Sequence, residues 1–122
     1  MIEKFLIGTG ILLVLAACTT NRFPEELRTD LHIGEANYFQ SRCPQYKKVD
    51  IERAFITYCL ANKLYNNGCN PQKTARSFIE GSLDGFTQAK IQYQHVADNK
   101  VCSIAESKYG TNGSVIKRFL TK

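Results

Sequence analysis

Apolar residues recur with helical spacing along most of this chain, and the clearest pattern begins at Pro71. Asn70 and Pro71 favour a helix start, because Asn can cap the first turn and Pro fits the first helical position. Beyond them, small or apolar residues repeat at helical intervals at Ala75, Phe78, Ile79, Ser82, Leu83, Phe86, Ala89 and Tyr93. The pattern predicts a long amphipathic helix with this stripe facing the core.

Weaker patterns predict further helices on both sides of this one. Residues 33–43 form a first helix that ends before Pro44, because proline disfavours helical backbone in the residue before it. Asp50 caps a helix that runs to Tyr65. Its predicted inward stripe is Ile56, Cys59, Leu60 and Leu64, with Phe55 beside it. Short helices are expected over 25–31 and 101–109.

The end of the chain is predicted to form a closing helix. Residues 110–113 contain two glycines and form a turn, and Ser114 then caps the helix. Its inward residues would be Val115, Ile116, Phe119 and Leu120.

Gly81 and Gly85 lie four residues apart inside the long predicted helix. Each costs up to about 1 kcal/mol relative to alanine in a helix interior, so their small size must serve a purpose. We expect a neighbouring helix to approach closely at this point; a partner surface is the alternative. Together the elements predict an all-α protein, a small disulfide-bonded bundle of four to five helices forming a single helical domain over 33–122.

The apolar run over residues 5–17 has a different character. It is shorter than the roughly 20 residues that a helix needs to cross a bilayer, and Gly8 and Gly10 interrupt it. A short head containing Lys4, an apolar stretch and small residues at its end are typical of a secretory signal peptide. We therefore interpret residues 1–17 as a signal peptide that is removed.

Leu15-Ala16-Ala17-Cys18 resembles the lipobox of bacterial lipoproteins. The resemblance implies cleavage before Cys18, lipidation of its thiol and acylation of the new amino terminus. Several acyl chains give stable anchoring where one gives only marginal binding. Residues 18–32 would then be the lipidated cysteine and a tether. Thr19, in place of Asp, implies an outer-membrane destination in a Gram-negative cell. An ordinary signal peptide with a chance cysteine is the alternative.

Besides Cys18, the mature chain has four cysteines, namely Cys43, Cys59, Cys69 and Cys102. In an exported protein they most simply form two disulfides, whereas metal ligation is disfavoured by the absence of a C-x-x-C motif. The predicted helix lengths place Cys43 and Cys102 at one height along the bundle, and Cys59 and Cys69 near another. This favours disulfides between Cys43 and Cys102 and between Cys59 and Cys69. The crossed pairing, Cys43 with Cys69 and Cys59 with Cys102, becomes preferable if the second helix stays regular beyond Leu64.

Charge and chemistry restrict the function. Removing residues 1–17 takes away one lysine and one glutamate, so the net charge stays at +5. Export excludes nucleic acid as a partner, but a basic C-terminal end could meet an anionic envelope surface or an acidic protein. That end contains Lys100, Lys108, Lys117, Arg118 and Lys122. A solvated helix end is the simpler interpretation of these charges.

Catalytic and cofactor signatures are missing from the sequence. It contains no G-x-S-x-G, phosphate loop or H-E-x-x-H motif. His32 and His95 fit surface or packing roles better than that of a base. Two pairs of carboxylates have simpler explanations than catalysis. Glu80 and Asp84 lie on the polar face of the long predicted helix, and Asp50 and Glu52 lie at a helix start. We expect a binding protein that has a protein partner and no catalytic residues, cofactor or metal.

The stretches "GEANYFQSRC", "FIEGSLDGF" and "VCSIAESKYGTNGSVIKRFL" resemble the periplasmic immunity proteins that neutralise peptidoglycan amidases delivered by type VI secretion. The resemblance implies a small, exported, helical and disulfide-bonded inhibitor. Ala75 and Ser103-Ile104-Ala105 depart from that pattern, which has a cysteine before the aromatic residue and Ile-Pro after the late cysteine. The alternative is a structural or assembly lipoprotein of a secretion or conjugation apparatus, including proteins that exclude a second conjugating donor.

Lipidation at Cys18 is directly testable. Mass spectrometry of the membrane fraction should find a mature amino terminus at an acylated Cys18, and Cys18→Ala should release the domain or stall its processing. An intact Met1, or a soluble form cut at another site, would contradict the prediction.

Overall fold

The computed structural model describes residues 24–66 and 68–122. The predicted signal peptide, Cys18 and residues 19–23 lie outside the described residues. The elements in chain order are η1 (Glu25–Leu27), α2 (Thr29–Arg42), β1 (Lys48–Val49), α3 (Ile51–Asn66), α4 (Pro71–Tyr93), α5 (Asp98–Tyr109) and β2 (Leu120–Thr121). The prediction of a small, disulfide-bonded all-α bundle is confirmed.

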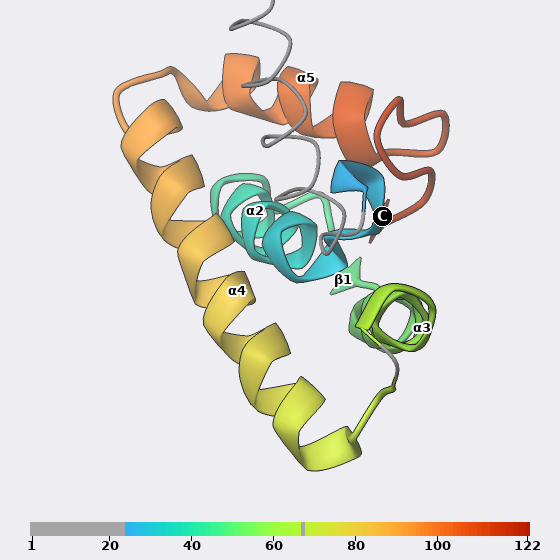
Figure 1. Ribbon diagram of the computed structural model, residues 1–122. Helices are drawn as coiled ribbons and strands as arrows, with labels where there is room; N and C mark the ends of the chain where they lie inside the picture. Colours follow the sequence, from blue (N-terminus) through green and yellow to red (C-terminus); the bar gives the residue numbers. More distant parts are fainter. Residues whose placement is uncertain (1–23, 67) are drawn as a thin grey trace, which may run out of the picture.

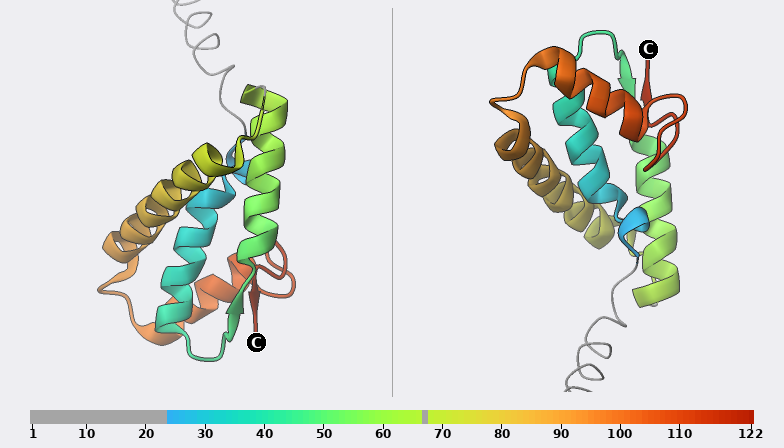
Figure 2. Two further views of the ribbon diagram at one scale, coloured as in Figure 1. Left: turned by 90° about the horizontal axis from the view of Figure 1, so that it is seen from below. Right: turned by 90° about the horizontal axis from the view of Figure 1, so that it is seen from above.

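Helix α2 lies at the centre of the bundle, between α3 and α4, and α5 crosses one end (Figures 1 and 2). Helix α2 crosses the second half of α4 and points the same way, since Asp30 lies against Gly81, midway along α4, and Arg42 donates to the Tyr93 carbonyl at the end of α4. Helix α3 meets the first half of α4 and points the opposite way, because Phe55 contacts Phe78 while Cys59 is bonded to Cys69, before α4 begins.

Three glycines allow α2 and α4 to approach each other closely. A Cβ atom on Gly34 would lie 2.0 Å from the Ser82 carbonyl oxygen, and one on Gly85 would lie 2.1 Å from the Leu31 carbonyl oxygen. A Cβ atom on Gly81 would overlap the carboxylate of Asp30. The close helix approach predicted at Gly81 and Gly85 is therefore confirmed, and it explains why poor helix formers occupy these positions.

The predicted inward stripes of α3 and α4 are wrong for their large aliphatic members, although Phe78 and Tyr93 of α4 are buried as predicted. On α4, Ile79 and Leu83 are 57% and 63% exposed, and the buried residues are Thr74, Phe78, Gly81, Gly85, Ala89 and Tyr93. On α3, Ile56, Leu60 and Leu64 are exposed, and the buried residues are Ala54, Tyr58 and Ala61. Both helices bury small residues and aromatic rings, because the short distance to α2 leaves no room for a row of leucines.

Aromatic rings fill the space where α2, α4, α5 and the C-terminal segment meet. The ring of Phe39 lies 5.3 Å from that of Tyr93 and 6.1 Å from that of Tyr109, measured between centroids. Tyr109 in turn lies 5.7 Å from Phe119. Tilted contacts at these distances are favourable beyond the area they bury, so this row of rings joins four segments that are distant in sequence.

Both disulfides have the pairing that the helix levels favoured. Cys43 and Cys102 are bonded with a Cα–Cα distance of 5.6 Å, which fastens the end of α2 to α5. Cys59 and Cys69 are bonded with a Cα–Cα distance of 5.3 Å, which fastens α3 to the segment before α4. The crossed pairing is excluded in this structure.

The predicted closing helix from Ser114 is absent from the described residues. The chain forms turns after Gly110, and β2 then pairs antiparallel with β1, with Lys48 opposite Thr121 and Val49 opposite Leu120. Backbone hydrogen bonds from Val115 to Lys108 and from Arg118 to Gly110 replace helical ones. Phe119 and Leu120 are nevertheless buried, as the sequence pattern predicted.

The folded domain begins earlier than residue 33. Thr29 and Asp30 are 3% and 1% exposed, and Thr29 Oγ1 donates to the Ala54 carbonyl. The buried carboxylate of Asp30 accepts two hydrogen bonds of 2.9 Å from Arg28. A buried charge needs such a partner, so residues 28–32 belong to the domain and the predicted tether over 18–32 is too long.

The glycine contact predicts a large effect of one methyl group. Gly34→Ala should lower the free energy of unfolding by about 1–3 kcal/mol or more, despite the better helix propensity of alanine, because the added Cβ meets backbone atoms of α4 that cannot rotate away. Urea unfolding measures this change. Ser103→Ala, at an exposed position of α5, is the control. Equal stability of the two variants would show that α2 and α4 are not in backbone contact.

Candidate functional site

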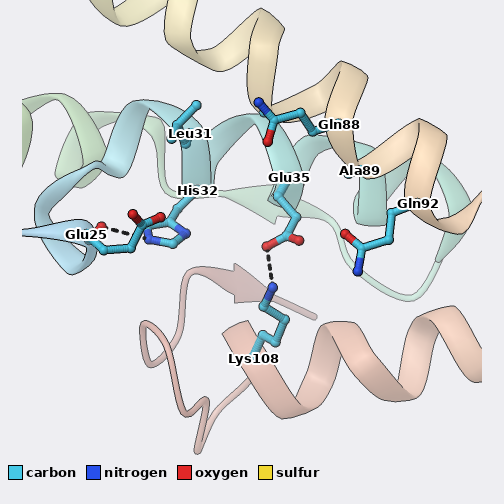
Figure 3. A pocket seen from close by; sticks show the side chains of 9 residues that line it. Glu25, Leu31, His32, Glu35, Gln88, Ala89, Gln92 and Lys108 are labelled. Carbon is cyan, nitrogen blue, oxygen red and sulfur yellow. Dashed lines mark hydrogen bonds and ion pairs between the residues drawn. The ribbon is translucent and has the colours of Figure 1, made fainter.

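A small polar pocket opens between η1, α2, α4 and α5 (Figure 3). Its volume is about 160 Å³. It is lined by Glu25, Leu31, His32, Glu35, Gly85, Gln88, Ala89, Gln92 and Lys108. Small-molecule sites usually enclose about 300–1,000 Å³, so this pocket has the size for a single protruding side chain.

Helix geometry brings these side chains together. His32 and Glu35 are three residues apart on α2, and Gln88 and Gln92 are four apart on α4, so each pair lies on one helix face. Gly85 lines the pocket without a side chain at the point where α4 meets α2. The same close approach that fixes the fold therefore places Gln88 and Gln92 on the α4 wall of the pocket and Glu35 on its α2 wall (Figure 3).

Glu35 is the centre of the polar contacts in the pocket. Its Oε1 lies 2.7 Å from Lys108 Nζ, and the two side chains are only 15% and 29% exposed. The buried Tyr109 hydroxyl also donates to Glu35. Burial and the nearby Glu35 charge raise the pKa of Tyr109, so its hydroxyl stays protonated and keeps donating.

His32 extends this network towards the chain start. Its Nδ1 lies 2.9 Å from the Tyr109 hydroxyl, and its Nε2 lies 3.2 Å from the Glu25 carbonyl oxygen. Since the Tyr109 hydroxyl gives its proton to Glu35, its oxygen can accept from a protonated Nδ1. In the neutral ring only one nitrogen carries a proton, so His32 can donate either to the Tyr109 hydroxyl oxygen or to the Glu25 carbonyl, and either bond agrees with a packing role for His32. His95, by contrast, is exposed after α4.

The pocket contains groups for recognition. The two glutamines offer donors and acceptors, Glu25 adds a carboxylate, and the Glu35 charge is neutralised by Lys108. None of the nine described residues that line it is a serine, threonine or cysteine, the usual oxygen and sulfur nucleophiles. Within 24–66 and 68–122, no group of three His, Cys, Asp or Glu residues is arranged to hold a metal ion.

The other residues singled out in the sequence are dispersed. Glu80 and Asp84 are exposed on α4. Asp50 Oδ1 accepts from the Arg53 backbone N–H at 3.1 Å, which confirms it as a helix cap, and Glu52 is exposed beside it. The structure does not bring these carboxylates into one site with the pocket.

The basic C-terminal end is broader than the sequence indicates. Pairing of β1 with β2 places Lys47 and Lys48 beside the last residues of the chain, because Lys47 donates to the Thr121 carbonyl. Two of the predicted cations have acidic partners, since Lys108 pairs with Glu35 and Lys122 Nζ lies 3.6 Å from Glu106. Lys117 and Arg118 are exposed.

No motif in the sequence marks Glu35, Gln88 or Gln92 as site residues. A glutamine pair spaced by one helical turn is common on solvated helices, so only the positions of α2 and α5 reveal that these amides border a recess. No protein-family model, curated protein or solved structure matches the chain. Among the described residues, no helix combines the length and hydropathy that a membrane span needs.

The Tyr109 network predicts a measurable loss of stability. Tyr109→Phe should lower the free energy of unfolding by about 1–3 kcal/mol, because Glu35 and His32 each lose a partner at a buried position. Urea unfolding checks this. Ser103→Ala, which removes a hydroxyl from an exposed position of α5, is the control and should change stability far less. An unchanged midpoint for Tyr109→Phe would contradict the network.

The pH dependence of the same variant gives a second prediction. The folded state raises the pKa of Tyr109, so the stabilising contribution of its hydroxyl is present below the unfolded tyrosine pKa of about 10 and is lost as the pH rises above it. The stability difference between the wild type and Tyr109→Phe should therefore shrink at strongly alkaline pH. A difference that grows there would have the wrong sign.

Proposed function

We propose that this protein is a lipid-anchored binding protein of the bacterial cell envelope that acts through contact with a protein partner and without catalysis. The observation that carries the proposal is Leu15-Ala16-Ala17-Cys18 at the end of a short apolar run. A lipidated cysteine at that position holds the domain at a membrane without a spanning helix.

The two disulfides support an exported location. Thiol-reducing systems keep disulfides rare in the cytosol, whereas they persist in the periplasm. The two disulfides use every cysteine of the mature chain except the one in the lipobox. They join Cys43 to Cys102 and Cys59 to Cys69.

The pocket supports recognition of a protein. A recess of about 160 Å³ is suited to one side chain of a partner, and the amides of Gln88 and Gln92 can pair with the polar atoms of that side chain. The rest of the contact would come from the surrounding helices, because a specific interface usually buries about 800 Å² on each partner.

The first candidate within this class is an immunity protein that inhibits a secreted peptidoglycan amidase. It rests on the three sequence stretches that resemble that family. The alternative is an assembly lipoprotein of a secretion or conjugation apparatus. Exposed apolar residues on α4, namely Ile79, Leu83 and Ile91, favour this alternative, because they offer a contact surface besides the pocket for another component.

Protection of a cell tests the immunity candidate. Co-expression with an exported amidase encoded beside the gene should prevent lysis, and Gln88→Arg should abolish that protection by filling the pocket. The matched control, Ser103→Arg, adds the same group to an exposed position of α5 and should protect fully. Thermal unfolding should show that both variants fold.

The outcomes separate the two candidates. Lysis in the presence of the wild-type protein, together with co-purification of apparatus components, would favour the assembly role. Saturable hydrolysis of peptidoglycan, ester or phosphate substrates by the purified form lacking Cys18 would overturn the non-catalytic proposal altogether.

A further inference from the structure

The outward face of α3 has an apolar stripe that the fold does not cover. Ile56, Leu60 and Leu64 are spaced by one helical turn, and they are 53%, 53% and 74% exposed. The opposite face of the same helix is buried through Ala54, Tyr58 and Ala61. A helix that is apolar on both faces has a second neighbour besides its own core.

The start of the described chain lies on the α3 side of the bundle. Thr29 donates to the Ala54 carbonyl, and η1 packs against α3 just before it. If Cys18 is lipidated, the five residues from 19 to 23 keep it within roughly 20 Å of Pro24 even when fully extended. The bilayer that carries the anchor is thus held within reach of α3.

The exposed apolar residues of α4 point elsewhere. Ile79 is two residues after Ser77, hence about 200° around the helix from it. Ser77 Oγ contacts the Tyr58 hydroxyl of α3 at 2.9 Å, so Ile79 lies on the flank of α4 that faces away from α3. Figure 2 shows α2 between the two helices, so a flat surface against the outside of α3 leaves α4 uncovered.

From these observations we propose that Ile56, Leu60 and Leu64 rest in the interfacial region of the membrane that holds the lipid anchor. Three aliphatic side chains on one face suit the shallow burial that interfacial helices adopt. Lys63 is exposed on the same face and can reach lipid phosphates while its apolar stem stays with the stripe. The inference rests on the proposed lipid anchoring and adds an orientation, in which α4 faces the periplasm and its partner.

The chain contains no tryptophan, which provides a clean probe. Leu60→Trp and, at the most exposed position, Leu64→Trp are made in the full-length protein and purified in mature form. Each is reconstituted into vesicles of phosphatidylethanolamine and phosphatidylglycerol, with and without brominated acyl chains. Leu83→Trp on α4 is the matched control, because Leu83 is 63% exposed, between Leu60 and Leu64, and lies one turn after Ile79 on the same flank of α4.

In vesicles, the emission of Leu60→Trp and Leu64→Trp should shift to the blue, and brominated lipid should quench it severalfold more strongly than that of Leu83→Trp. Equal quenching of all three variants overturns the proposal, as does a blue shift without quenching by brominated lipid, which would place a second copy or another protein on the stripe. Mass spectrometry of the amino-terminal peptide distinguishes failure of the proposed orientation from failure of the proposed anchoring. An acylated protein with unquenched α3 probes refutes only the orientation, whereas an unacylated Cys18 refutes the anchoring and the orientation together.

Discussion

The backbone contact between α2 and α4 is the constraint on which the rest of the structure depends. Gly34 and Gly85 let each helix touch main-chain atoms of the other, at distances that any Cβ atom would prevent. Such proximity leaves α4 with a narrow buried face, so its larger aliphatic residues turn outwards. It also sets Gln88 and Gln92 close enough to Glu35 to form the polar pocket.

Arg42 and the Cys43–Cys102 disulfide hold the other end of the bundle. The Arg42 guanidinium donates to the carbonyls of Tyr93 and Val96, and it lies 2.6 Å from the Asp98 carboxylate. One side chain thus satisfies the carbonyls at the end of α4 and meets the acidic first turn of α5. The adjacent disulfide ties the next turn of α5 covalently to the end of α2, so two contacts fix the position of α5 and with it that of Lys108 in the pocket.

Features set by local chemistry could be predicted from the sequence. Asn70 accepts from the Lys73 backbone at 3.0 Å, as expected for a cap before Pro71, and the helix levels led to the observed disulfide pairs. Features set by tertiary packing could not be predicted. Counting apolar residues selected Ile79 and Leu83 as core, because hydropathy does not register how closely a glycine lets another helix approach.

The C-terminal segment and the pocket also depend on tertiary packing that the local sequence does not reveal. Residues 114–119 have a helical apolar pattern, yet they form turns that lead into β2, and Phe119 and Leu120 are buried there, with Phe119 against Tyr109. In this segment the local pattern identified Phe119 and Leu120 as buried but predicted the wrong backbone conformation. The pocket likewise depends on the meeting of four segments, which no single stretch encodes.

The contact between α2 and α4 is most directly tested by nuclear Overhauser effects in the oxidised protein. The structure predicts a strong cross-peak between the α protons of Gly85 and Leu31, since a Cβ atom on Gly85 would lie 3.0 Å from the Leu31 Cα. Absence of that cross-peak, combined with contacts from the side chains of Ile79 and Leu83 to α2, would mean that α4 is rotated onto its aliphatic stripe and would contradict the account.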